Sequence, residues 1–144
     1  MRKKSQLPDY IIKFVKLNLL LAIILNGCTP SGIIIDREQF ETPVKKMYLK
    51  DYPYLKICHG GILQQIPLRQ IQLIKIDPAS SIFYENELYY GVDLIFKNGG
   101  KNNSSKDNDA LCAYVSIENT VVGKSKEQSF SITLDNVKQI KVKK

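Results

Sequence analysis

Hydrophobic and polar positions divide the chain into an apolar N-terminal segment and a longer part patterned for β strands. After residue 54, short runs of β-branched and aromatic residues alternate with turn residues, which is the composition of strands on a pleated surface. No long apolar stripe at helical spacing follows residue 60. The pattern predicts a mainly β fold, a small antiparallel β-sandwich or barrel. We expect strands at 54–58, 62–68, 71–76, 88–96, 111–117, around 121 and at 130–134.

Other local signals refine this picture. Three consecutive isoleucines at 33–35 predict a first strand or a stapled segment, because three exposed isoleucines would be costly. Residues 44–50 fit one short helical turn. The pair Gly60-Gly61 is a strong hairpin signal, and Asn86, flanked by two glutamates, fits a second hairpin turn.

One sequence pattern occurs twice. Residues 66–76 and 132–142 both follow I-x-L-x-x-[I/V]-x-x-I-K-[I/V]. The pattern predicts a strand, a tight polar corner and a second strand whose apolar residues face the same core. A duplicated β unit explains the echo, and so does the ordinary spacing of apolar residues in β proteins; the sequence leaves both open.

The N-terminal segment has the layout of a secretory signal. Arg2, Lys3 and Lys4 open it, and residues 17–25 form a nearly pure apolar run of nine. Secretory signals have an apolar region of about 7–15 residues, whereas crossing a membrane takes about 20. A cleaved signal peptide is therefore the favoured interpretation, and an uncleaved anchor is the alternative.

The apolar run ends in Leu25-Asn26-Gly27-Cys28, which resembles the lipobox of bacterial lipoproteins: an aliphatic residue, two small residues and a cysteine. Asn26 departs from the usual small residue. The resemblance implies a diacylglycerol thioether on Cys28, cleavage before it, and acylation of the new amine. Two or three acyl chains give stable anchoring, whereas a single chain is marginal. The alternative is an ordinary secretory signal with a coincidental cysteine.

These features predict the organisation of the chain. Residues 1–27 are expected to form the signal peptide, in a helix, and 28–35 the lipidated cysteine with its tether. Residues 36–144 are expected to form one β-rich domain. Within it, the stretch 97–109, which has no apolar residue, is expected to form a flexible loop.

Charge argues against nucleic acid as a partner. The formal net charge is +7, but five bases and one acid precede Gly27, so that the remainder carries only +3. A mild excess over that length is not the concentrated basic face that phosphate binding needs. The expected partners are the membrane, through the lipid anchor, and a protein that the sequence does not identify.

Two cysteines remain beside Cys28. Cys58 and Cys112 are candidates for a disulfide, because the predicted compartment permits one. The alternative is two separate buried thiols that behave as small apolar residues. His59 follows Cys58 directly, so in a strand their side chains point to opposite faces and cannot form a nucleophile–base pair.

No catalytic or metal-binding arrangement is recognisable, and we expect neither enzyme activity, nor a cofactor, nor a metal site. Tyrosine suits interfaces because it combines rigid apolar area with a polar tip. Tyr84, Tyr89 and Tyr90 are therefore a candidate interaction face, and the rim of a β core is the alternative role for them.

The sequence thus predicts an envelope lipoprotein, anchored to the cell membrane or outer membrane and facing the periplasm or exterior. Its β domain is expected to serve protein interaction or structural support. A binding module for a small ligand, a lipid or a glycan is the alternative.

Overall fold

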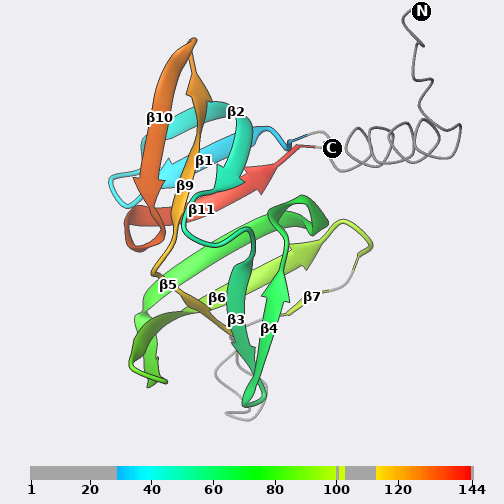
Figure 1. Cartoon of the computed structure of the whole chain (residues 1–144), viewed down its shortest axis with the longest axis vertical. Helices are drawn as coiled ribbons and strands as arrows, with labels where there is room; N and C mark the ends of the chain where they lie inside the picture. Colours follow the sequence, from blue (N-terminus) through cyan, green and yellow to red (C-terminus); the bar gives the residue numbers. More distant parts are fainter. Residues whose placement is uncertain (1–28, 100, 103–112, 144) are drawn as a thin grey trace, which may run out of the picture.

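A single antiparallel sheet accounts for most of the folded chain (Figure 1). This computed structural model describes residues 29–99, 101–102 and 113–143, with the backbone alone for 101–102. Within these residues the sheet has eleven strands and curls into a half-barrel. The prediction of a mainly β antiparallel fold is confirmed. The expected signal helix and Cys28 lie outside the described residues.

The sheet consists of two halves of similar construction, the upper half and the lower half of Figure 1. In spatial order, the upper half contains β10 (Gln128–Thr133), β9 (Thr120–Ser125), β2 (Glu41–Leu49), β1 (Gly32–Asp36) and β11 (Val137–Val142). The lower half continues with β5 (Ile71–Tyr84), β6 (Glu87–Phe96), β8 (Ala113–Ser116), β3 (Leu55–His59) and β4 (Ile62–Ile66). The short β7 (Lys101–Asn102) pairs with β6 beside this path.

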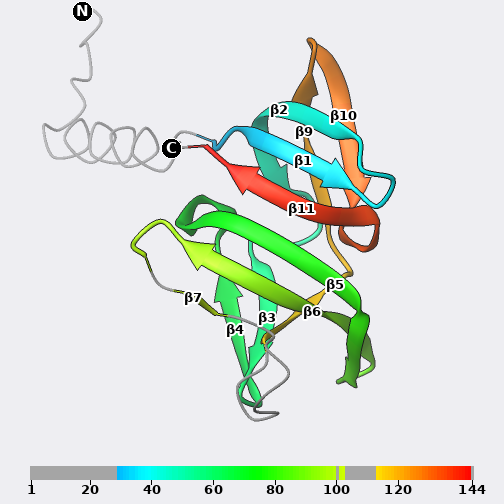
Figure 2. The ribbon, with the colours of Figure 1, turned by 180° about the vertical axis from the view of Figure 1, so that it is seen from behind.

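The halves join where β11 pairs with β5, and they are related there by an approximate two-fold axis (Figure 2). Ile140 lies opposite Ile74, which is the residue that matches it in the repeated sequence pattern. The flanking pairs are Gln139 with Lys75 and Lys141 with Leu73. In the repeated pattern Gln139 matches Leu73 and Lys141 matches Lys75, so the two pairs are related by the same two-fold axis. Counted outward from this junction, β11, β1, β2, β9 and β10 correspond to β5, β6, β8, β3 and β4.

The repeated sequence pattern forms the same structure twice. β4 leads through the 3₁₀ turn η1 (Leu68–Gln70) into β5, and β10 leads through η2 (Leu134–Asn136) into β11. Each turn begins with a buried leucine, whose carbonyl accepts a hydrogen bond from the backbone N–H of the first residue of the next strand. The strand–corner–strand interpretation is therefore confirmed in both copies.

The upper half is built from both ends of the described chain. β1 lies between β2 and β11, so Gly32 is paired with Val142, 110 residues later. The strand expected at 33–35 is confirmed, and the folded domain begins at Gly32 rather than at residue 36. Of the loop expected at 97–109, Lys101–Asn102 forms β7, and residues 100 and 103–109 lie outside the described residues.

In the described part of the chain, three two-residue turns connect hairpins, and both central residues of each have positive φ, as type I′ turns require. The turn at Gly60-Gly61 confirms the first predicted hairpin, and the turn at Glu85-Asn86 confirms the second. The third, Lys126-Glu127, connects β9 to β10.

The helical turn predicted at 44–50 is wrong, because these residues lie in β2 and the bend after it. Val44 and Met47 are both buried, and their spacing of three resembles that of a helix. A β-bulge produces this spacing: the register with β9 shifts between Lys45 and Tyr48, and Lys46 has a φ of 52°. The extra residue brings both apolar side chains to the same face of the strand.

Candidate functional site

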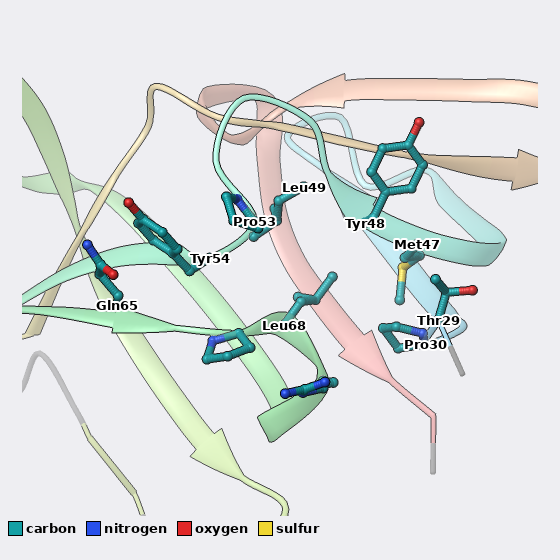
Figure 3. A pocket seen from close by; sticks show the side chains of 11 residues that line it. Thr29, Pro30, Met47, Tyr48, Leu49, Pro53, Tyr54, Gln65 and Leu68 are labelled. Atoms are coloured by element: carbon teal, nitrogen blue, oxygen red, sulfur yellow. The ribbon is translucent and has the colours of Figure 1, made fainter. Parts of the chain in front are cut away.

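A cavity of about 580 Å³ lies between the upper and lower halves, beside the start of the described chain (Figure 3). The end of β2 borders it on one side, and η1 with the start of the lower half borders it on the other. Its lining consists of Thr29, Pro30, Met47, Tyr48, Leu49, Pro53, Tyr54, Gln65, Pro67, Leu68 and Arg69.

The lining combines a buried apolar part with exposed amphipathic side chains. Met47, Leu49 and Leu68 are buried and belong to the hydrophobic core. Tyr48 is 55% exposed, and Gln65 and Arg69 are exposed as well. The volume falls within the range of about 300–1,000 Å³ that small-ligand sites occupy. The cavity therefore suits a molecule with an apolar body and a polar end.

Few ionisable side chains line this cavity among the described residues. Among the described residues that line the cavity there is no aspartate, glutamate, histidine or cysteine. The single charged group is the guanidinium of Arg69, which suits an anionic or hydrogen-bond-accepting end of a ligand.

Asn119 holds together the two connections that cross between the halves beside this cavity. Its side chain is 5% exposed, and its Nδ2 donates to the carbonyls of Tyr52 and Tyr54, at 3.2 Å each. Its Oδ1 accepts from the backbone N–H groups of Asp51 and Thr120. Sequence reasoning missed this residue, because asparagine in a loop is common and nothing local distinguishes this one.

A second polar feature, an ion pair in the lower half, lies outside the lining of the cavity. The Nζ of Lys56 on β3 donates to Oε1 of Glu87 on β6 at 2.6 Å, and the side chains are 15% and 21% exposed. The Oγ of Ser116 on β8 donates to Oε2 of Glu87 at 3.0 Å. Lys56 Nζ also lies 3.9 Å from the ring centroid of Tyr52, a cation–π distance.

These contacts shift the ionisation of three side chains. The hydrogen bond from Lys56 lowers the pKa of Glu87, and burial opposes this shift in part. The same hydrogen bond raises the pKa of Lys56. Burial, together with the charge of Glu87, raises the pKa of Tyr89 to about 12. All three groups therefore keep one protonation state near neutral pH, which favours a structural role in joining β3, β6 and β8.

The three tyrosines expected to share an exposed face do not do so. Tyr89 is 2% exposed and contacts Tyr84 edge-on, with 6.2 Å between ring centroids. Tyr90 is half-buried, packs against the core and lies 5.8 Å from the guanidinium carbon of Arg37. Adjacent residues of a strand point to opposite faces, which separates Tyr89 from Tyr90. The prediction is corrected to a core and core-rim role.

The structure places one of the three cysteines. Cys58 lies on β3, is 5% exposed and is followed by the half-buried His59. Cys112, its predicted disulfide partner, lies outside the described residues, and so does the lipidation candidate Cys28. The disulfide and the lipid modification both stay predictions.

The described residues contain neither a metal-ligand cluster nor a membrane-spanning helix. Across 29–99, 101–102 and 113–143, no group of histidine, cysteine and carboxylate side chains has the arrangement of a metal site. In the same residues, no helix has the length and apolar character needed to span a bilayer.

Comparison with known proteins leaves the site to be interpreted from its own geometry. No protein-family model and no curated protein matches the sequence.

Proposed function

We propose that this protein is a membrane-anchored envelope lipoprotein whose noncatalytic β domain serves protein interaction or structural support. The observation that carries the proposal is the sequence Leu25-Asn26-Gly27-Cys28 at the end of the apolar run. The position of the first strand supports it. β1 begins at Gly32, so cleavage before Cys28 would leave every described strand in the mature chain.

The short tether between Cys28 and the sheet also supports the proposal. Pro30 accepts a hydrogen bond from the backbone N–H of Met47 at 2.7 Å, and Ser31 accepts one from Lys143 at 2.8 Å. Only residues 29–31 separate Cys28 from β1, so the distance from Cys28 to Gly32 is at most about 14 Å even when the chain is fully extended. A lipid on Cys28 would therefore hold the domain against the membrane surface.

An edge strand supports protein interaction. β4 ends the sheet, and burial falls almost entirely on its last residue, Ile66. Ile62 is 65% exposed and Leu63 is 39% exposed. An exposed edge strand with apolar side chains is a site where another chain can add a strand.

The cavity between the halves favours the second candidate function, a binding module for a small ligand, lipid or glycan. Its volume of about 580 Å³ and its mixed lining suit an amphipathic molecule. A fluorescent fatty acid is an appropriate probe. Binding should be saturable and weakened by Gln65→Trp, which fills the lining, but not by Gln72→Trp, at an exposed position outside it. Equal effects of both variants would contradict this function.

Metabolic labelling with a fatty acid tests the main proposal. Label should appear on the wild-type protein, disappear in Cys28→Ser and persist in Cys58→Ser, the matched control at another cysteine. Absence of label from the wild type, or its persistence in Cys28→Ser, would refute lipid anchoring.

Photocrosslinking in intact cells tests the interaction role. A photoreactive residue at Ile62 on the edge strand should capture a defined protein, whereas one at the exposed Glu38 should not. Identical products from both positions would speak against β4 as the interaction site.

A further inference from the structure

Four lysines surround a hollow where the described chain begins. Lys45, Lys124, Lys126 and Lys143 line a cavity of about 370 Å³, together with Ser31 and Gly32. All four lysines are exposed. They come from β2, from β9 and the turn after it, and from the residue that follows β11. We refer to these four lysines and the cavity between them as the basic hollow.

The arrangement is unfavourable for the isolated domain. Lys45 lies directly opposite Lys124 in the pairing of β2 with β9, and like charges at facing positions repel each other. Glu127 approaches Lys45 at 3.7 Å, but the two side chains are 77% and 80% exposed. An ion pair so exposed is screened by solvent and compensates little. The basic hollow is therefore short of negative charge.

The opposite end of the same strands carries acids, together with the bases Arg37 and Lys138. Asp36 ends β1, Glu41 begins β2, and Asp135 lies in the turn before β11. The antiparallel register places Gly32 beside Val44 and Ile35 beside Glu41, so the lysines and these carboxylates lie at opposite ends of the upper half. The basic end is the one from which the chain continues towards Cys28.

We propose that the basic hollow binds anionic headgroups of the membrane that carries the lipid anchor. The basic hollow of the upper half then faces the bilayer, and the end that carries Asp36, Glu41 and Asp135 points away from it. This inference rests on the proposed lipid anchoring at Cys28.

Reach and charge both support this occupant. Ser31 lines the hollow, and three peptide units of about 3.8 Å each separate its Cα from that of Cys28. Attraction between lysines and an anionic bilayer decays within a Debye length of about 8–10 Å. A lipid on Cys28 would hold the hollow within this range of the phosphates, where the repulsion between Lys45 and Lys124 is compensated.

Lysine reactivity in the lipidated protein tests the proposal. The protein is reconstituted into nanodiscs of phosphatidylcholine alone or of phosphatidylcholine with phosphatidylglycerol, and an amine-reactive reagent is added. Labelling of the basic hollow, read by mass spectrometry, should be several-fold slower in the anionic discs. Labelling of Lys75 and Lys138, which lie away from the hollow, should not change.

Charge variants supply the matched comparison. Lys124→Gln combined with Lys126→Gln should remove most of the difference between the two kinds of disc at Lys45 and Lys143. Lys138→Gln, which removes one exposed lysine elsewhere, should leave it intact. Equal labelling of the hollow in both discs would overturn the proposal. So would equal protection by inorganic phosphate added to the zwitterionic discs, because free anions would then be the ligand.

The same spectra keep this inference apart from the proposed function. The mass of the peptide that contains Cys28 reports whether the lipid is present. A lipidated Cys28 with an unprotected hollow refutes the headgroup site alone, whereas an unmodified Cys28 refutes the lipid anchor.

Discussion

Replacing Glu87 by glutamine should destabilise the folded domain. Glu87 is the acceptor for both Lys56 and Ser116, so it links three strands of the lower half. Glutamine keeps the size of the side chain and one carbonyl acceptor, but it removes the negative charge. The ammonium of Lys56, whose side chain is 15% exposed, then lacks its counter-charge.

The expected penalty follows from this degree of burial. Breaking a fully buried ion pair by removing one partner costs about 3–5 kcal/mol, whereas exposed pairs contribute about 0.2–1 kcal/mol. Side-chain exposures of 15% and 21% lie between these limits, so we expect about 2 kcal/mol for Glu87→Gln near neutral pH. Lys56→Met in the same background should cost less than it does alone, because the two groups are coupled.

The pH dependence distinguishes this ion pair from a packing effect. The pKa of Glu87 is lower in the folded chain than its ordinary value of 4.5. The stability that its carboxylate contributes is therefore complete above about 4.5 and is lost as pH falls through the folded-state pKa. Glutamine does not titrate, so the difference between wild type and Glu87→Gln should shrink in acid.

Urea unfolding at neutral and acidic pH measures this difference, with Glu38→Gln as the control at an exposed glutamate. The reasoning would be refuted if Glu87→Gln were as stable as the wild type at neutral pH. It would also be refuted if the loss of stability caused by the substitution were as large in acid as at neutral pH.

Three further outcomes follow from the packing. Gly32→Ala should destabilise the domain by more than about 2 kcal/mol in urea unfolding, because a Cβ there would lie 2.2 Å from the carbonyl oxygen of Lys141; a neutral result would contradict this approach. Ile74→Ala and Ile140→Ala should each cost about 2–5 kcal/mol by the same measurement, and penalties that differ widely would argue against equivalent halves. Cys58 should resist a thiol reagent until the protein is unfolded, and rapid labelling in native buffer would show that it is not buried.

Local signals predicted two of the described two-residue hairpin turns, but not the one at Lys126-Glu127. Gly60-Gly61 and Glu85-Asn86 occupy turns whose positive φ values restrict the choice of residue, so the sequence carries the information at the turn itself. The repeated pattern at 66–76 and 132–142 likewise contains the buried leucine and the corner in consecutive positions.

Burial spacing misled the prediction at 44–50. In β2, β5 and β11 the buried residues follow a spacing of three and then two: 44, 47 and 49; 71, 74 and 76; 137, 140 and 142. The pairing of each strand contains a register shift that accommodates one extra residue. In this protein, buried residues spaced by three and then by two are therefore typical of a bulged strand. A helix also places buried residues three positions apart, so the first interval alone does not distinguish the two structures.

Contacts between residues that lie far apart in the sequence could not be predicted from local patterns. The role of Asn119 depends on backbone groups 65 and 67 residues away, and that of Glu87 on a lysine 31 residues before it. The tyrosine face failed for the same reason, because which side of β6 faces the core depends on how the whole sheet curls.

Because β1 lies between β2 and β11, the upper half of the sheet can form completely only after β11 has been synthesised. During synthesis, β1 obtains β2 as a neighbour almost at once, but its other neighbour, β11, is made last among the described strands. The same late strand connects the upper half to the lower half through β5. A product that lacks β11 therefore has two half-sheets with unpaired edges, and it is prone to aggregate or to be degraded.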